Sequence, residues 1–423
     1  MSVSSEAIQL LSIFGVVMLV GILLTLLSRK LKITHVLLLT LAGVVIQKIT
    51  VAYHVAFPFP HLLLICLGIL ALVFIVFDGA SRLQIKEVDK FGVPAINVIV
   101  LFIIFNIFII TGLFTLLFFN TISGTILLGG VLFACMIAAT DPGTLFAFGK
   151  PNNKAMELLD IEGIFNTPIC VILPLIVLDI MVGVHQNYAL AVVDQIMPFL
   201  KQIIVGVGAG VIIGVIIFKS MKKVYVEQIS PVGLFVAALL AYTGAELLEG
   251  SGILAVGTFG ILFGNMIVKN KEALQSFNSM LSGLFVILVF MVVGSLVPLQ
   301  LDGLFLLKGL IVFLVLVFTR LFAFELFYYH KADFTHREKF FMALMMPKGI
   351  ATAIVIFTLS VMTFTVEIQG VIDVVVQLSL LVVIYSLITA TIVYKFAPWF
   401  MKKEEDLKRD IVSPVKKSGK RPQ

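Results

Sequence analysis

Residues 138–168 read AATDPGTLFAFGKPNNKAMELLDIEGIFNTP, and this stretch decides how the rest of the chain is interpreted. Two apolar segments flank one short basic loop, and four polar residues lie inside them: Thr140, Asp141, Glu162 and Asn166. A carboxylate at membrane depth costs folding free energy, so the acids found there usually serve an ion or proton pathway. Two such acids on neighbouring segments predict an ion or proton site, with the remaining chain as its scaffold.

The composition indicates that most of the chain lies in a lipid bilayer. Hydrophobic residues make up 60% of the 423 positions and charged residues 13%, too apolar a balance for any water-soluble core. The net charge of +6 comes from cations between the apolar runs rather than on one face, so it does not predict nucleic-acid binding. The sequence has no P-loop motif, so no nucleotide is expected to drive it. We therefore expect an all-α polytopic membrane protein that is not an enzyme.

Thirteen apolar runs are long enough to span a bilayer. They cover roughly 6–27, 34–51, 61–78, 93–119, 122–148, 157–181, 198–218, 230–247, 252–268, 277–298, 303–328, 339–361 and 369–396. Alternate connections carry 25 of the 30 lysines and arginines on one side and three on the other. The positive-inside rule then places the N-terminus outside and the C-terminus in the cytoplasm. The first run lacks a basic segment before it and is interpreted as a retained helix.

A proline should interrupt the fifth run directly after its acid. Pro142 cannot donate to the carbonyl of Ala138, and Gly143 weakens the next turn, so the helix is expected to break. Irregular backbone at membrane depth is tolerated where it lines a cavity, and its freed carbonyls can bind a cation. The alternative interpretation is a simple kink. Asp141 beside the break favours a site.

The sixth run carries the next polar group. Glu162 and Asn166 are four residues apart and share one helix face, and Gly163 lies one turn before Thr167. Their oxygen atoms are hard ligands of the kind that alkali cations prefer. The alternative is that Asn166 and Thr167 only join helices through hydrogen bonds.

A second proline interruption is predicted in the twelfth run, at Pro347, followed by Lys348. Two interrupted helices in corresponding halves of a chain indicate an inverted-repeat transporter whose site lies where they cross. From helix rise, the acids and Lys348 lie at depths of roughly 8 to 14 Å and could meet. Arg320 reaches a similar depth. The expected ion pairs are Glu162 with Lys348, and Arg320 with Glu325 or Asp141.

Together these segments resemble the monovalent cation:proton antiporter superfamily, and most closely its NhaP-type sodium/proton exchanger branch. The resemblance covers essentially the whole membrane region. Five stretches carry it: Phe77-Asp78-Gly79, residues 139–142 (ATDP), residues 162–166 (ExxxN), residues 242–264 (YTGAELLEGSGILAVGTFGILFG) and Lys348-Gly349. Each motif alone is weak, whereas their combination is specific.

The resemblance implies an inverted-repeat antiporter fold of thirteen helices with two proline-broken crossing helices, working as a homodimer in the lipid bilayer of a prokaryotic plasma membrane. Residues 1–401 would form one transporter unit, with a core domain at about 93–181 and 303–396, a dimerisation domain at about 6–78 and 198–298, and a basic cytoplasmic tail at 402–423. By the same carry-over, Thr140 and Asp141 would bind the monovalent cation, Asn166 would support the site, and Glu162 would form a structural ion pair with Lys348. No cofactor is implied.

One position departs from the family pattern. The family follows the asparagine with an aspartate that exchanges cation for protons, and here that residue is Thr167, which cannot titrate near neutral pH. The leading hypothesis is therefore exchange of Na⁺ or K⁺ for H⁺ with Asp141 as the titrating ligand, and with Thr140, Asn166, Thr167 and backbone carbonyls completing the shell. The alternatives are an uncoupled cation uniporter or a transporter of another solute, and a membrane protein that transports nothing.

Overall fold

The computed structural model describes residues 3–31, 33–53, 60–82, 85–141, 154–183, 196–221, 229–267, 270–328 and 334–400. Every regular element within these ranges is a helix, which confirms the all-helical prediction. In chain order the helices are α1 (Val3–Leu31), α2 (His35–Ala52), α3 (His61–Ser81), α4 (Ile85–Phe118), α5 (Gly124–Ala138), α7 (Lys154–Gly183), α9 (Ile196–Met221), α10 (Ser230–Leu247), α11 (Gly252–Asn265), α12 (Lys271–Leu296), α13 (Gly303–Phe327), α14 (His336–Leu344), α15 (Ile350–Val361), α16 (Val366–Lys395) and α17 (Ala397–Phe400).

Ten of the described helices are long and apolar enough to cross a membrane, and three shorter apolar helices, α5, α11 and α15, accompany them. Each predicted apolar run corresponds to one helix, except the run at 339–361, which is divided between α14 and α15. The number of membrane crossings itself stays a prediction. The proposed tail at 402–423 and the expected helix break at Pro142 lie outside the described residues.

Local sequence signals fix several helix starts. The hydroxyl of Ser123 accepts a hydrogen bond from the Ile126 N–H at 3.2 Å and caps α5. At α14, Thr335 and Glu338 form a capping box in which each side chain accepts from the other's backbone. These caps satisfy amide groups that the first turn of a helix leaves without partners.

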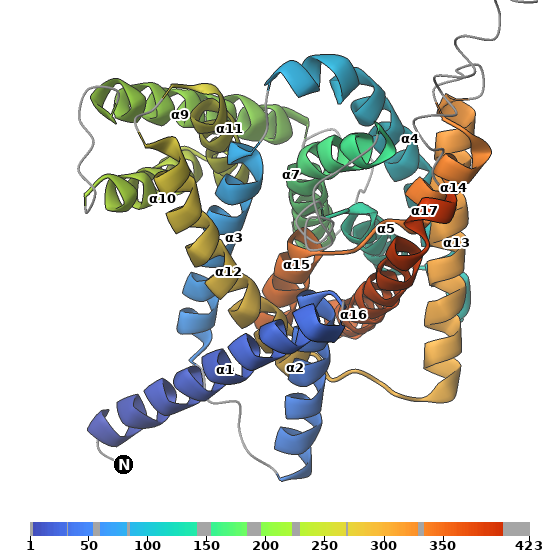
Figure 1. The fold of residues 1–423 in the computed structure, drawn as a ribbon. Coiled ribbons are helices and arrows are strands. Elements are labelled where there is room, and N and C mark those ends of the chain that lie inside the picture. Colours follow the sequence, from blue (N-terminus) through green and yellow to red (C-terminus); the bar gives the residue numbers. More distant parts are fainter. Residues whose placement is uncertain are drawn as a thin grey trace, which may run out of the picture.

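Figure 1 shows the helices gathered in two groups. On one side α3 and α12 pack with α9, α10 and α11, while on the other α4, α5, α13 and α16 pack together with α14 beside them. Helix α7 lies against α4 and α5, and α15 lies between the groups, with contacts to α12 and α3 on one side and to α7 and α16 on the other. This arrangement places the ends of α5 and α14 near the middle of the molecule.

Helices α2 and α12 approach each other unusually closely. A Cβ atom added to Gly43 would lie 2.3 Å from the carbonyl oxygen of Met291 and 2.8 Å from the Cα of Gly294. Only hydrogen atoms fit at these two positions, so the two helix backbones touch directly. Small residues at helix crossings are typical of membrane proteins, where close packing and not hydrophobic burial drives association.

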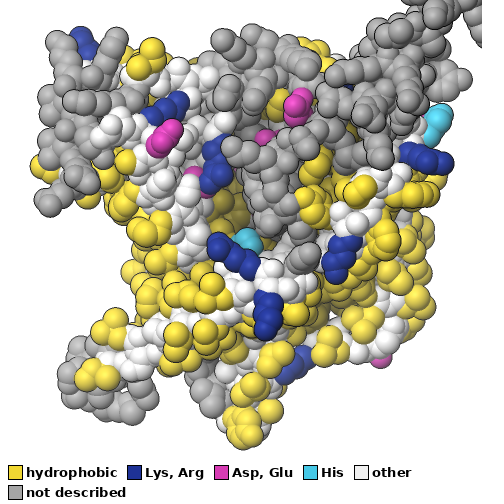
Figure 2. All heavy atoms as spheres, viewed as in Figure 1, with side chains coloured by type: hydrophobic (Ala, Val, Ile, Leu, Met, Phe, Trp, Pro, Cys, Tyr) yellow, Lys and Arg dark blue, Asp and Glu magenta, His cyan; other side chains and the backbone are white. Residues whose placement is uncertain are grey.

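The outer surface is strongly apolar. Helix α1 packs against α2 and α12. Most of its described large apolar side chains are exposed; for example, Ile8 is 64% exposed and Leu11 is 70% exposed. Figure 2 shows hydrophobic side chains over most of the lower half of one face, with Asp and Glu side chains mostly in the upper half. Such a surface would be unfavourable in water and is suited to lipid.

Candidate ion site

Two non-helical segments meet in the centre of the molecule. Helix α5 ends at Ala138 and residues 139–141 are extended, while α14 ends at Leu344 and α15 begins only at Ile350. The Asp141 N–H donates to the Pro347 carbonyl at 3.0 Å, which joins the segments directly. The interrupted backbone thus satisfies its polar groups within the protein, as it must at membrane depth.

Lys348 makes the second link between the two segments. Its side chain is fully buried, and its ammonium donates to the Ala139 carbonyl at 2.9 Å. The Lys348 N–H donates to the hydroxyl of Ser386 in α16 at 3.0 Å. Lys348 therefore acts as a donor that holds the end of α5 in place.

Asp141 lies at the first turn of α15. One of its carboxylate oxygens, Oδ2, accepts from the Ile350 N–H at 3.3 Å, so the acid sits at the positive end of the helix dipole. Gly349 makes this approach possible, since a Cβ added there would lie 1.7 Å from Asp141 Oδ2. The α15 N-terminus stabilises a negative charge on this side chain.

Asn166 connects α7 to the end of α5. Its amide nitrogen donates to the Ala138 carbonyl at 2.8 Å and to the Thr140 hydroxyl at 3.3 Å, and the side chain is fully buried. Together with Lys348 on Ala139, these bonds give two of the carbonyls at the end of α5 a donor from the protein. The sequence pattern leads one to expect such carbonyls as cation ligands, and here a cation would have to share each oxygen with that donor.

A cavity of about 590 Å³ reaches this crossing from one side of the molecule. Asp141 and Thr167 both line it, among mostly apolar neighbours such as Phe165 and Ile350. The Thr167 hydroxyl donates to the Gly163 carbonyl at 2.7 Å, one turn back in α7. Its oxygen keeps acceptor capacity toward the cavity because a hydroxyl has two lone pairs.

The same cavity is also lined by a polar group at the end of α3. Asp78 accepts from the Arg82 guanidinium at 2.9 Å and from the Ser279 hydroxyl of α12 at 2.7 Å. Arg29 and His35 line the cavity as well. A cation that entered this way would pass one carboxylate already engaged by a guanidinium.

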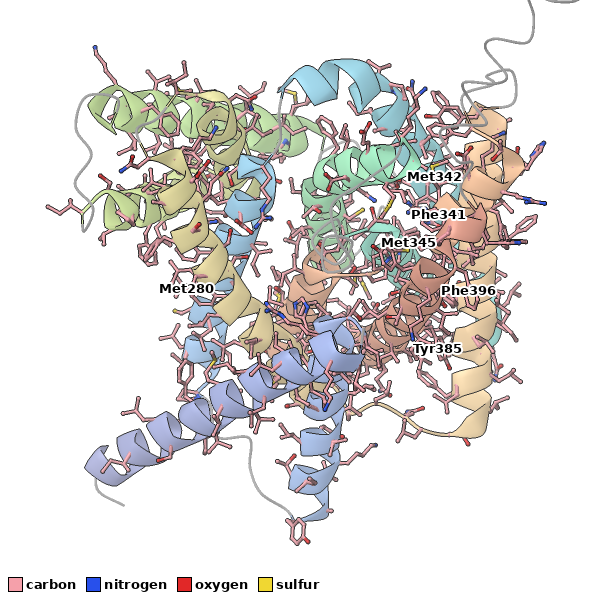
Figure 3. The ribbon with its side chains drawn as sticks, in the orientation of Figure 1. Met280, Phe341, Met342, Met345, Tyr385 and Phe396 are labelled. Carbon is pink, nitrogen blue, oxygen red and sulfur yellow. The ribbon has the colours of Figure 1, made fainter. Side chains whose placement is uncertain are left out.

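Glu162 lies deeper than Asp141 and pairs with Arg320. The Arg320 Nη2 and Glu162 Oε2 atoms are 2.8 Å apart, and the two side chains are 0% and 1% exposed. The guanidinium also donates through Nε to the Met342 carbonyl at 3.3 Å and lies over the rings of Phe102 and Phe324. Figure 3 labels Met342 and Met345, which lie where α14 ends. This pair anchors α7 and α13 to the end of α14.

The expected partners of these charges are therefore wrong. The structure gives Glu162 the guanidinium of Arg320 as its hydrogen-bonded cation and directs Lys348 to a backbone carbonyl instead. Glu325, proposed as a partner of Arg320, bonds to His336 and Lys339 near the surface. Depth along the helices allowed either cation to reach Glu162, and the rotation of α13 about its axis decides which one does.

Comparison with known proteins identifies the family of this chain. Residues 15–400 match the family model described as sodium/hydrogen exchanger, transmembrane. The chain belongs to this family. Within it, the similarities are to antiporters of the NhaP type.

This chain is similar in sequence to several named antiporters. It is 26% identical over 309 residues to a probable Na⁺/H⁺ antiporter 2 of Methanocaldococcus jannaschii, covering 66% of this chain and 68% of that protein. It is 26% identical over 258 residues to the K⁺/H⁺ antiporter NhaP2 of Shewanella sp. strain ANA-3, covering 58% of this chain and 43% of the relative. This chain thus spans less than half the length of NhaP2.

A solved structure has a similar fold. The sodium proton antiporter MjNhaP1 from Methanocaldococcus jannaschii superimposes with a TM-score of 0.76 over 93% of this chain and 98% of that one, at 21% sequence identity. At this level of identity the likeness concerns the fold alone.

Three residues where the two interrupted segments cross were not predicted from sequence. Ser386 accepts from the Lys348 N–H, Thr352 donates to the Met136 carbonyl at 3.2 Å, and the Cys170 thiol donates to Asn166 Oδ1 at 2.8 Å. Small polar residues in a span usually bond within their own helix, so they give little signal. Their helical spacing is the signal that could have found two of them, because Thr352 follows Lys348 by four residues and Cys170 follows Asn166 by four.

Proposed function

We propose that the chain is a secondary transporter that exchanges Na⁺ or K⁺ for H⁺ by alternating access. The observation that carries this proposal is the position of Asp141. Its carboxylate lies where two interrupted segments meet, beside Thr140 and on the wall of a cavity that it shares with Thr167. A carboxylate that solvent and ions can reach, inside a membrane protein, is suited to bind either a cation or a proton.

The proposed coupling follows from the number of titrating ligands. Thr167 cannot lose a proton near neutral pH and Glu162 is paired with Arg320, whereas Asp141 lies at the crossing on the cavity wall, so we assign the exchange to Asp141. One carboxylate that holds either one cation or one proton gives electroneutral exchange in a ratio of one to one. Thr140 and Thr167 would add neutral oxygen ligands, and Asn166 would support the segment. The transported ions would be substrates and not cofactors.

The wider architecture is part of the same proposal. The chain would cross the membrane thirteen times, with inverted repeats and a second proline break at Pro142. The core, at about 93–181 and 303–396, would move against a dimerisation domain at about 6–78 and 198–298. The two groups of packed helices and the exposed apolar face of α1 support a homodimer embedded in lipid. A prokaryotic plasma membrane, with the N-terminus outside, is the proposed location.

A second candidate is a cation uniporter or a transporter of another solute on the same fold. Two observations favour it: Thr167 cannot titrate, and the Ala138 and Ala139 carbonyls already accept hydrogen bonds from Asn166 and Lys348. An oxygen that already accepts a hydrogen bond is a weaker ligand for a small cation, and a loosely bound ion need not displace a proton.

Proteoliposomes that contain the purified protein and an internal pH dye separate these candidates. Na⁺, K⁺ or Li⁺ is added outside, with and without a protonophore and valinomycin. Exchange predicts saturable proton movement that persists when the membrane potential is clamped. Cation flux without obligatory proton movement would overturn the exchange proposal in favour of the uniporter. No cation flux would overturn both exchange and the uniporter and leave a transporter of another solute.

A further inference from the structure

The orientation of the Asn166 amide is fixed by its surroundings. A backbone carbonyl can only accept a hydrogen bond, so the group that lies 2.8 Å from the Ala138 oxygen must be the amide NH₂. The second amide hydrogen is directed to the Thr140 hydroxyl at 3.3 Å. The Oδ1 atom therefore points away from the end of α5.

The Cys170 thiol donates a hydrogen bond to that oxygen. Its Sγ lies 2.8 Å from Asn166 Oδ1, one turn further along the same face of α7, and both side chains are fully buried. A neutral thiol is a hydrogen-bond donor, so it matches an amide oxygen and not an amide nitrogen. The amide thus has a defined partner at each end and a single favourable orientation.

This orientation determines what the cation would meet. Asn166 presents two N–H groups toward Ala138 and Thr140 and no oxygen, so it cannot be a cation ligand in this arrangement. Thr140 accepts from the amide with one lone pair and keeps the other for an ion. If the amide turned over, its oxygen would face the Ala138 carbonyl, and Thr140 would lose a donor.

We propose that Cys170 is a positioning residue that locks the Asn166 amide, and that it thereby sets which oxygens of the Asp141 and Thr140 segment face the transported cation. The inference rests on the proposed exchange function and refines its ion site. It predicts that the thiol influences cation affinity without touching the cation, because it acts through Asn166.

Cys170→Ala and Cys170→Ser separate this role from simple packing. Alanine removes the donor, whereas serine keeps an O–H donor in a smaller side chain. We expect Cys170→Ala to raise the apparent KM for the cation about three- to tenfold, the size of one neutral hydrogen bond, with Vmax within twofold of wild type. Cys170→Ser should restore KM to within twofold of wild type. Cys135→Ala, which removes a buried thiol from the neighbouring α5, is the matched control and should leave KM unchanged.

Two kinetic results would overturn the inference. One is a Cys170→Ala protein with wild-type KM, and the other is a serine variant as impaired as the alanine variant, which would mean that sulfur volume matters and the donor does not. Size-exclusion chromatography and thermal unfolding check that each variant is folded before KM is compared.

A spectroscopic measurement tests the hydrogen bond without transport. In the infrared difference spectrum between wild type and Cys170→Ala, the Cys170 S–H stretch should lie at a lower frequency than that of a thiol without an acceptor, and Asn166→Ala should shift it upward. A free S–H frequency in the wild type would contradict the inference even if exchange is found. Conversely, absence of exchange with a hydrogen-bonded S–H would overturn only the proposed function.

Discussion

Glu162 and Asp141 are two acids of the same membrane core with opposite surroundings. Glu162 is fully buried, bonded to the Arg320 guanidinium at 2.8 Å and away from the cavity. Asp141 lies on the cavity wall at the N-terminus of α15, with the amide of Ile350 as one of its donors. A charge that is paired and sealed from water contributes to the fold, whereas one within reach of ions can change its proton or its cation.

Breaking the buried pair should have the largest effect. Glu162→Gln leaves the Arg320 guanidinium without a counter-charge in a fully buried site. We expect a loss of about 3–5 kcal/mol in the free energy of unfolding, and with it most of the folded protein in the membrane. Thermal unfolding in detergent and the yield of monodisperse protein measure this.

The double variant Glu162→Leu with Arg320→Met is the control for that experiment. It removes both charges and should recover much of the lost stability. A single variant as stable as wild type would mean that the pair does not anchor α7 and α13.

The second prediction concerns the accessible acid. Asp141→Asn should abolish cation–proton exchange, at least a hundredfold, because an amide neither binds a proton nor balances a cation. The unfolding temperature and the oligomeric state should stay close to wild type. Proton movement in proteoliposomes is the measurement, and unaltered exchange in the variant would remove Asp141 from the mechanism.

The third prediction tests how closely Asp141 must be held. Gly349→Ala places a methyl group 1.7 Å from the present position of Asp141 Oδ2, so the carboxylate or the segment has to shift. Since a displacement of about 1 Å can cost up to a hundredfold in a positioned site, we expect exchange to fall roughly ten- to a hundredfold. Gly370→Ala in α16, where a Cβ meets nothing within 4 Å, is the matched control. Equal activity of the two variants would contradict the close approach.

The fourth prediction adds an acid instead of removing one. Thr167→Asp places a second titrating group on the cavity wall with Asp141 and should move the pH of half-maximal exchange by roughly half a unit or more. Thr167→Val, which removes only the hydroxyl, should leave the profile in place. The rate of exchange measured across the pH range decides the matter. An unchanged profile in the aspartate variant would show that position 167 does not face the ion.

The smallest effect is expected at an exposed acid. Glu249 lies between α10 and α11 and accepts a hydrogen bond from Lys201 of α9. This hydrogen bond and the positive charge of Lys201 lower the pKa of Glu249 below its ordinary value of 4.5. The pair's contribution to stability is therefore present above pH 4.5 and is lost as the pH falls through the lowered folded-state value. Because the side chains are 49% and 79% exposed, Glu249→Gln should not measurably change the unfolding temperature at neutral pH or exchange. A clear change in either would mean that burial is not what separates the acids.

Local rules predicted some features of this protein well. A proline lacks the N–H that a helix needs, and the chain is non-helical around Pro347, whereas α4 continues through Pro94. Polar residues within apolar runs likewise drew attention to Thr140, Asp141 and Asn166, which the structure places together.

Pairing between helices was harder to predict, because it depends on the rotation of each helix about its axis. The depths estimated from the sequence placed Arg320 and Lys348 at similar levels in the membrane. In the structure, Glu162 accepts its hydrogen bond from Arg320. Ser386 gave no signal in the sequence, and Cys170 gave only its spacing of four residues from Asn166, because thiols and hydroxyls in spans commonly bond to their own helix. The occupied carbonyls of Ala138 and Ala139 follow from the same long-range contacts.

The contact of α2 with α12 has a mechanical consequence. Where two helices are separated by side chains, one can slide over the other as rotamers change, but Gly43 and Gly294 leave no such layer between the backbones. The two helices should therefore move together as one rigid unit. In the proposed alternating access, the contacts of α12 and α3 with α15 would then be among those that change.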